Sequence, residues 1–274
     1  MGFFGRVKNC YKEDKLLKQG KYLEAIEAYD KALEAKHYSD AGYDMMIWYN
    51  KGMAFGNLGQ NQEALKCHDK ALRADPKFVR ALYGKSVELT ELKRYDEAIQ
   101  YCDKILKLNP KKVKMLIGIG SIMCKAGEYQ EAIECFDKAL ELNPRNTELL
   151  TIKGSSLEKL GKHQEAKECY QDALKYCDKS LKKDPNNSIL MGYKSLILEK
   201  LGENQESIKC CDKILETNPE FPLVWYIKGL NLEKLEKSQE AIECYDKVLE
   251  IKPDYPEAKE NKEIILAELA KQHR

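Results

Sequence analysis

Ten cysteines are the residues of this sequence with the clearest capacity for chemistry, because thiolates bind metals and form disulfides. No C-x2-C pair occurs, and most of the cysteines recur at two adjacent positions of a repeating pattern. Residues at equivalent positions of stacked helical hairpins lie about 10 Å apart, which is too far for a disulfide. We therefore interpret the cysteines as small apolar packing residues, whose free thiols favour a reducing cytoplasm. A metal- or redox-responsive module that uses Cys210 and Cys211 is the less favoured alternative.

The four histidines and the acidic residues do not form a catalytic pattern. We find no phosphate-binding glycine loop, no nucleophile elbow and no H-E-x-x-H zinc motif. His68 stands where neighbouring repeats carry Cys102, Phe136 and Tyr170, so we interpret it as a core or boundary residue rather than a base. The sequence therefore predicts a protein that is not an enzyme and that has no cofactor and no metal.

One stretch, Glu131 to Pro144, recurs in near copies from end to end of the chain. Its glutamate recurs at Glu24, Glu63, Glu97, Glu131, Glu165, Glu206 and Glu240. The successive gaps are 39, 34, 34, 34, 41 and 34 residues. A period of 34 residues is typical of a solenoid built from helical hairpins, so function is expected to come from binding through a repeated surface.

Each repeat has the pattern of two helices joined by a tight turn. Gly127 follows the first helix of the fourth repeat, where glycine adopts the left-handed conformation without penalty. Lys93 and Glu236 replace this glycine in two repeats, so we expect strain in those turns. The second helix ends before Pro144, because proline cannot donate a hydrogen bond to the preceding turn. The sequence thus predicts stacked helix pairs.

The second repeat matches the family pattern W-x2-L-G-x2-Y followed by A-x3-F, A and P. The matching positions hold Trp48, Lys51, Gly52, Phe55, Ala64, His68, Ala71 and Pro76. The chain therefore resembles the tetratricopeptide-repeat family over nearly its whole length. The resemblance implies an all-α fold, a right-handed α-α superhelix of stacked antiparallel helix pairs that forms a single domain over residues 1–274. Its repeats are expected at residues 6–39, 45–78, 79–112, 113–146, 147–187, 188–221 and 222–255, with a capping helix at 256–272.

Two features depart from the family pattern. Lysine replaces the leucine beside the glycine in every repeat except the fourth, which has Ile119, and we expect the lysine stems to pack while the ammonium groups reach outward. The fifth repeat holds seven extra residues, and seven residues rotate a helix face by only about 20°. We predict two extra turns of helix there and not a loop. Both a neutral and a functional insertion stay open.

Charge balance and hydropathy argue against two classes of partner. Lysine and arginine number 46 against 45 aspartates and glutamates, which leaves no basic field for nucleic acid. The longest apolar runs fall far short of a membrane span, and residues 1–8 lack the core of a signal peptide. We therefore expect a soluble, cytoplasmic protein with neither nucleic acid nor membrane as partner.

The resemblance also implies where a partner binds. First helices of the family line a concave groove that usually holds an extended peptide or a helix of another protein. We expect this groove to be aromatic and apolar with few charges, and tyrosine suits an interface because it offers a large contact area at low entropic cost. The expected binding residues are Tyr49, Asn50, Met53, Arg80, Tyr83, Val87, Ile117, Ser121, Thr151, Tyr193 and Tyr226. The alternative is that some of them support neighbouring hairpins.

Some members of the family clamp the C-terminal carboxylate of chaperones, but this chain does not reproduce the clamp. Cys10, Asp14 and Gly84 stand where lysine, asparagine and arginine are required. We therefore predict a non-enzymatic scaffold that binds a peptide or helix of some other partner protein. The alternative is an assembly protein that self-associates through Phe3 and Phe4 or through the long fifth hairpin.

Overall fold

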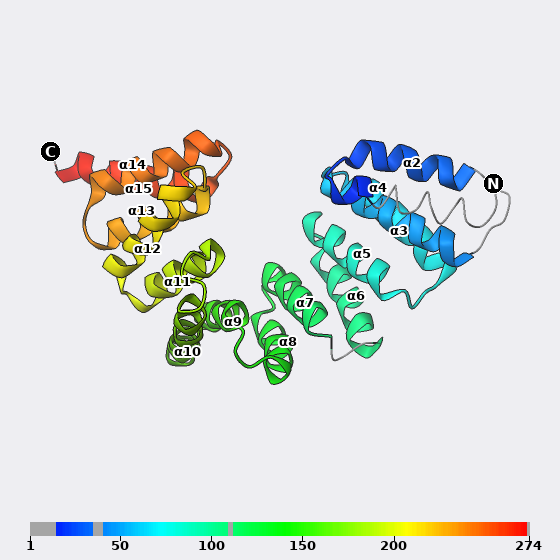
Figure 1. Ribbon diagram of the computed structural model, residues 1–274, viewed down its shortest axis with the longest axis horizontal. Coiled ribbons are helices and arrows are strands. Elements are labelled where there is room, and N and C mark those ends of the chain that lie inside the picture. The colour runs from blue at the N-terminus through cyan, green and yellow to red at the C-terminus, as the bar shows by residue number, and fades with distance from the viewer. Residues whose placement is uncertain (1–14, 35–40, 109–111, 273–274) are drawn as a thin grey trace. The chain divides into compact units, whose positions relative to one another are not determined.

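The computed structural model describes residues 15–34, 41–108 and 112–272 (Figure 1). Within these ranges the chain forms helices and turns and no β-strand. In the same ranges we find no helix that is both long and apolar enough to cross a membrane. The chain divides into two compact units, residues 1–139 and 140–274, which we call unit 1 and unit 2.

Unit 1 alternates along the chain between the first and the second helix of each repeat (Figure 1). Its helices are α2 (Tyr22–Glu34), α3 (Ala41–Asn57), α4 (Asn61–Ala74), α5 (Val79–Glu91), α6 (Tyr95–Leu108), α7 (Val113–Ala126) and most of α8 (Tyr129–Leu142). α3 packs on α4, α4 on α5 and α5 on α6, so consecutive helices form one stack. The segment with Phe3, Phe4, Cys10 and Asp14 lies outside the described residues.

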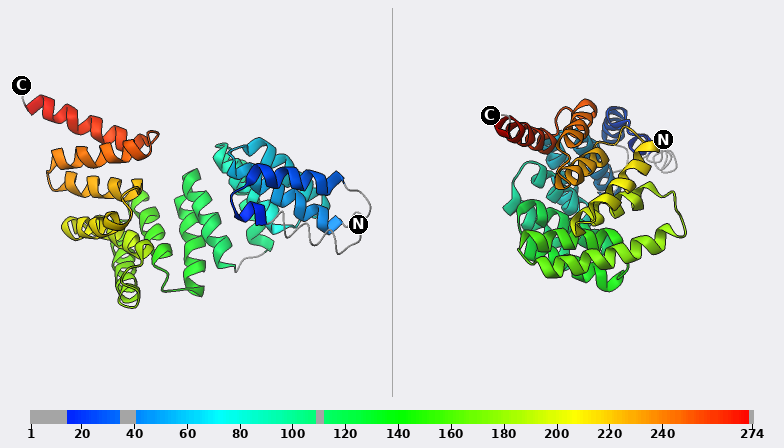
Figure 2. Two further views of the ribbon diagram at one scale, coloured as in Figure 1. Left: turned by 45° about the horizontal axis from the view of Figure 1, so that its top comes forward. Right: turned by 90° about the vertical axis from the view of Figure 1, so that its left-hand side faces the viewer.

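Unit 2 has the same alternation, and Figure 2 shows its paired helices from two further sides. Its helices are α9 (Thr147–Lys159), α10 (His163–Leu181), α11 (Ser188–Leu201), α12 (Asn204–Thr217), α13 (Pro222–Lys234), α14 (Ser238–Ile251) and α15 (Pro256–Gln272). α15 occupies the range of the expected capping helix and buries Ala258 and Ile265 against α14. In both units the predicted all-α fold of stacked antiparallel helix pairs is confirmed.

Large aromatic rings of the second helices lie directly on glycines of their own first helices. A Cβ added at Gly120 would lie 2.4 Å from Cε1 of Phe136. Gly229 meets Tyr245 in the same way, at 2.6 Å from its Cε1. Because atoms in a close-packed core do not approach so closely, only glycine lets the two helices meet at this separation.

The tight turns inside the hairpins need a residue with positive φ. Gly127 and Gly202 adopt φ angles of 88° and 79° after α7 and α11. Lys93 and Glu236 take the same place with a φ of 59°. A residue with a Cβ in this left-handed region costs about 1 kcal/mol relative to glycine. The predicted strain in these two turns is confirmed.

Four of the lysines that replace leucine in the repeat pattern form ion pairs between hairpins, and so does Lys262 in the capping helix α15. Each described pair joins a first helix to an aspartate on the preceding second helix, as Lys194 Nζ and Asp178 Oδ1 do at 2.7 Å. The pairs are Lys51–Asp30 and Lys85–Asp69 in unit 1, and Lys194–Asp178, Lys228–Asp212 and Lys262–Asp246 in unit 2. The lysine side chains are mostly buried, as predicted, but their ammonium groups bind carboxylates instead of only reaching water.

We expect the Lys194–Asp178 pair to contribute about 0.5–1 kcal/mol to the unfolding free energy of unit 2, because both side chains are only partly buried. A double-mutant cycle with Lys194→Met and Asp178→Asn measures this coupling by urea unfolding, and the coupling should shrink in 1 M NaCl. The exposed pair Lys209–Glu206 within α12 is the control and should couple more weakly. A coupling of zero for Lys194–Asp178 would contradict the expectation.

The insertion in the fifth repeat is helical. α10 spans 19 residues, whereas α12 and α14 each span 14. All seven inserted residues lie in the helix, because α10 places Tyr170 and Asp178 eight residues apart where α14 has Tyr245 and Asp246 adjacent. α10 then ends three residues after Asp178, whereas α14 ends five residues after Asp246, so the turn before α11 is longer, at residues 182–187 against 218–221 before α13. The prediction that the insertion is helical and not a loop is confirmed.

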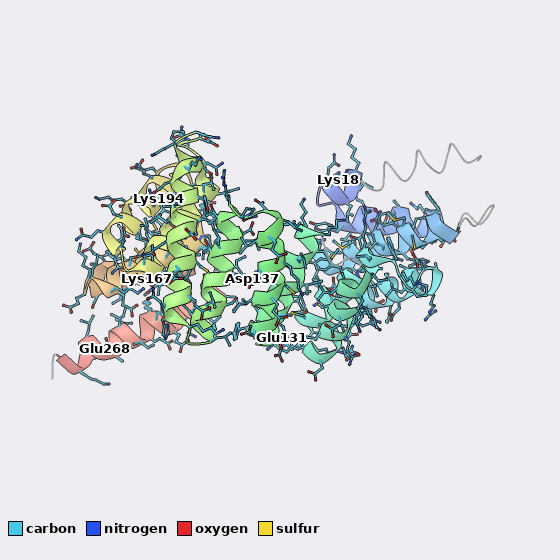
Figure 3. All side chains as sticks on the ribbon, turned by 90° about the horizontal axis from the view of Figure 1, so that it is seen from below. Lys18, Glu131, Asp137, Lys167, Lys194 and Glu268 are labelled. Carbon is cyan, nitrogen blue, oxygen red and sulfur yellow. The ribbon has the colours of Figure 1, made fainter. Side chains whose placement is uncertain are left out.

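The longer helix divides its contacts between its two neighbours. In α14 the buried ring and the paired aspartate are adjacent in sequence, Tyr245 and Asp246. In α10 they are eight residues apart, because Tyr170 packs on α9 and Asp178 binds Lys194 of α11. Figure 3 labels Lys194 among the side chains of unit 2. The first half of α10 therefore packs on the preceding helix and its last turns pack on the following one.

Candidate functional site

The expected binding residues of unit 1 lie on the first helices α3, α5 and α7. Six of them are half-buried, namely Tyr49, Met53, Tyr83, Val87, Ile117 and Ser121. Arg80 is exposed, whereas Asn50 is only 7 % exposed and belongs to the packed interior. The part of the predicted surface that a partner can reach is therefore mainly aromatic and apolar.

Tyr49 and Tyr83 each lean on the neighbouring repeat. Tyr49 packs edge-on against Phe78, with ring centroids 5.5 Å apart, and lies 5.9 Å from the ring of His68. Tyr83 covers Gly118 of α7, where an added Cβ would lie 2.3 Å from its Oη. Burial raises the pKa of both hydroxyls, so both are hydrogen-bond donors at neutral pH. These rings therefore support the stack as well as offering surface.

The predicted residues of unit 2 differ in accessibility. Thr151 is 1 % exposed, and its hydroxyl donates to a backbone oxygen of its own helix at 2.7 Å, so it offers no surface. Tyr193 is half-buried, and burial together with the Glu148 carboxylate raises its pKa to about 12. Tyr226 is half-buried with its ring 5.2 Å from that of Tyr255. Tyr193 and Tyr226 thus remain available to a partner.

Charged residues that the sequence interpretation missed run along the first helices of unit 2. Lys200 lies 3.3 Å from Glu158 of α9, and Lys234 of α13 binds Glu199 of α11. Glu199 is only 5 % exposed. These charges lie at the C-terminal ends of the first helices, outside the residues that are expected to bind a partner. The signal was a Glu-Lys dipeptide at the same position of α9, α11 and α13.

His68 is a buried core residue, as predicted. It is 0 % exposed, and both ring nitrogens lack a hydrogen-bond partner. The ring fills the gap between Gly52 of α3 and Gly84 of α5, where an added Cβ would lie 2.6 Å from its atoms on either side. Burial lowers the pKa of His68 to about 4, and Lys85 adds to this effect while Asp69 opposes it. The imidazole is therefore neutral at physiological pH.

Glu88 is a second unusual group that the sequence interpretation missed. It is 5 % exposed and lies on Gly56 of α3, where an added Cβ would be 2.3 Å from Glu88 Oε1. Its carboxylate makes no hydrogen bond or ion pair with the described residues. Burial, with a smaller contribution from Glu91, raises the pKa of Glu88 to about 7. The equivalent positions of the other repeats hold no acid, so an acid at this repeat position alone could have marked Glu88 in the sequence. These positions hold Ala54, Ile122, Ser156, Ile197 and Asn231.

The cysteines do not form a reactive or metal-binding site among the described residues. In that part of the chain no three His, Cys, Asp or Glu side chains are placed to hold one metal ion. Burial raises the pKa of Cys102 and of Cys211 to about 12, and it also raises that of Cys210. Protonated, buried thiols are poor nucleophiles and poor ligands. The geometry therefore favours the packing interpretation over the metal or redox alternative.

Three family models match parts of the chain. The tetratricopeptide-repeat model matches residues 49–112, anaphase-promoting complex, cyclosome, subunit 3 matches 91–171, and the Psidin N-terminal TPR repeats region matches 167–261. The TPR repeat-containing protein MJ0941 of Methanocaldococcus jannaschii is 35 % identical over 63 residues, which cover 21 % of this chain and 19 % of that protein. The match thus spans about a fifth of this relative's length.

Solved structures with the same fold cover more of the chain. A tetratricopeptide repeat protein from Parabacteroides merdae has a TM-score of 0.72 at 18 % identity, with coverage of 95 % of this chain and 98 % of that one. The Cut9–Hcn1 hetero-tetramer of the anaphase-promoting complex gives 0.61 at 16 % identity, with 94 % and 55 % covered. MamA from Desulfovibrio magneticus gives 0.57 at 22 % identity, with 66 % and 98 % covered. At these identities the likeness concerns the fold.

Proposed function

Because this chain is a tetratricopeptide-repeat protein, we propose that it is a non-enzymatic scaffold that holds an extended or helical segment of another protein on the first helices of unit 1. The repeat fold supports a protein-binding scaffold in general. The observation that carries the finer proposal is the group of half-buried side chains Tyr49, Met53, Tyr83 and Val87 on α3 and α5. We call this group the unit 1 surface.

The chemistry of the unit 1 surface suits a peptide. Tyrosine and methionine are enriched in interface cores, because tyrosine combines large apolar area with a polar tip and methionine adapts its shape. The hydroxyls of Tyr49 and Tyr83 are protonated and can donate to the backbone carbonyls of a bound segment. In unit 2, Tyr193 and Tyr226 give a second surface of the same kind, bordered by the Lys234–Glu199 ion pair.

Selection of peptides from a phage-displayed library of random 12-residue sequences tests this function. For a selected peptide we expect the double variant Met53→Ala, Tyr83→Ala to weaken binding at least about tenfold, because interface anchors of this type contribute about 2 kcal/mol or more. Fluorescence anisotropy of the labelled peptide measures the dissociation constant. Circular dichroism of each variant should show unchanged helicity.

Tyr101→Ala is the matched control, because Tyr101 is a half-buried tyrosine on the second helix α6. Its ring is covered by Lys85 and Lys104, whose Nζ atoms lie 4.7 and 4.6 Å from the ring centroid. We expect this variant to bind the peptide as the unmodified protein does. A loss with Tyr101→Ala and none with the double variant would place binding on the second helices and contradict the proposal.

A further inference from the structure

The carboxylate of Glu88 lies inside the stack next to the unit 1 surface and is unpaired among the described residues. It is carried by α5 directly after Val87, and it rests on Gly56 of α3, one turn beyond Met53. Only 5 % of the residue is exposed. Burial of an ionised carboxylate without a partner is unfavourable, so buried acids are normally paired. Glu88 therefore lies beside two side chains of the proposed binding surface without the partner that its burial calls for.

Unit 2 shows how this fold satisfies a carboxylate of the same burial. Glu199 of α11 is also 5 % exposed, and the ammonium group of Lys234 on α13 binds its Oε1. In unit 1 the lysine at the position equivalent to Lys234 is already engaged, because Lys125 Nζ lies 2.6 Å from Glu91 Oε1. Among the described residues, no other cation reaches Glu88.

We propose that a lysine or arginine side chain of the bound partner segment pairs with the Glu88 carboxylate where it lies against Gly56. This inference rests on the proposed function and adds a specificity: the segment carries a basic residue placed between the apolar side chains that contact Met53 and Val87. A metal ion does not fit, because no second and third ligand accompany Glu88 in the described part of the chain.

The experiment compares peptides that the library selects at pH 7.5 on the unmodified protein, on Glu88→Gln and on Glu91→Gln. Glutamine keeps the shape of Glu88 and removes its charge. We expect peptides selected on the unmodified protein to share one basic position, and its replacement by glutamine to weaken their binding at least about tenfold. Glu88→Gln should cause the same loss, and the two changes together should cause no further loss. Glu91→Gln should stay within about twofold, because Glu91 is exposed and already paired with Lys125.

A second readout is the pH dependence of the affinity. Pairing requires an ionised Glu88, whose pKa is about 7 in the free protein, so binding should tighten about tenfold between pH 6 and pH 8. Glu88→Gln should abolish this dependence for a peptide without histidine. Peptide binding that is equally pH-dependent in the variant would overturn the inference.

The outcomes separate this inference from the function on which it rests. Two results would overturn the inference alone. In the first, the selected peptides need Met53 and Tyr83 but share no basic residue. In the second, replacing the basic residue of a peptide by glutamine weakens its binding to Glu88→Gln as much as its binding to the unmodified protein. Peptides that are indifferent to Met53 and Tyr83, or a library that yields no binder, would overturn the proposed function and the inference with it.

Discussion

His68 is expected to lower the unfolding free energy of unit 1 by about 3 kcal/mol as the pH falls from 6.5 to 4, and His68→Phe is expected to abolish this decrease. The pKa of His68 is about 4 in the folded chain and about 6.5 when unfolded. In this window the unfolded chain binds a proton that the folded chain refuses, so stability is full above pH 6.5 and falls as the pH drops toward 4. The variant has no titrating ring and should not show this slope.

The structure explains why the folded chain refuses the proton. An imidazolium needs acceptors for two N–H groups, and neither ring nitrogen of His68 has a partner in the part of the chain that the structure describes. Gly52 and Gly84 lie against the ring on its two sides, and neither has a side chain that could accept a hydrogen bond. Asp69, the adjacent acid, is engaged by Lys85.

Glu88 acts in the opposite direction in the same unit. Its pKa is raised from 4.5 to about 7, so the folded chain binds a proton that the unfolded chain releases, and unit 1 gains stability as the pH falls from 7 to 4.5. Between pH 6.5 and pH 4.5 the two slopes oppose each other. His68→Phe should therefore expose the gain from Glu88, and Glu88→Gln should expose the loss from His68.

Urea unfolding followed by Trp48 fluorescence measures these slopes in a Trp225→Phe background, where Trp48 is the remaining tryptophan and reports on unit 1. The unfolding free energies of the variants are compared at each pH, so the contributions of the other carboxylates cancel in the difference. His163→Gln changes an exposed histidine of unit 2 and should leave the slope of unit 1 unaltered. If His68→Phe and the unmodified protein have the same pH dependence, the buried neutral imidazole is not its cause.

Gly229→Ala is expected to destabilise unit 2 by about 1–3 kcal/mol, because the new Cβ would lie 2.6 Å from Cε1 of Tyr245. The ring cannot easily move aside. It is fully buried, its hydroxyl donates to Glu233 Oε2 at 2.9 Å, and the hydroxyl oxygen accepts a hydrogen bond from Asn261 Nδ2 at 3.4 Å. The overpacking should outweigh the gain in helix propensity.

Gly192→Ala is the matched control in the same unit. Gly192 lies inside α11, and an added Cβ would meet no atom within 4 Å. With no clash, the substitution should stabilise unit 2 by about 0.5–1 kcal/mol, since alanine restricts the unfolded chain and favours helix. Trp225 fluorescence during urea unfolding, in a Trp48→Phe background, measures both variants. Equal stabilities for the two alanine variants would show that the Tyr245 ring adjusts.

The repeat pattern predicted the helices, their turns and the long α10, because each of these depends on residues close together in sequence. The strain at Lys93 follows from one missing glycine, and the helical insertion follows from its length of seven residues. The burial of His68 followed from its register with Phe136 and Tyr170.

Partner choice across repeats was harder to predict, because it depends on how neighbouring helices are packed. Lys85 and Asp69 are 16 residues apart, as are Lys194 and Asp178, and this constant separation marked the ion pairs in the sequence. The unpaired state of Glu88 had no such mark, since only the packing shows that no lysine of residues 15–34, 41–108 and 112–272 reaches it.

The division of contacts along α10 bears on how an array of this kind changes its length. Tyr170 contacts α9 and Asp178 binds Lys194 of α11. These two residues of α10 are seven residues further apart than Tyr245 and Asp246 of α14, so α11 contacts the same face of α10 about two turns further along. An insertion of five residues would have turned that face by about 140°, and Asp178 would have pointed away from Lys194. Insertions of seven residues therefore lengthen such a helix while its contacts with the following helix stay on the same face.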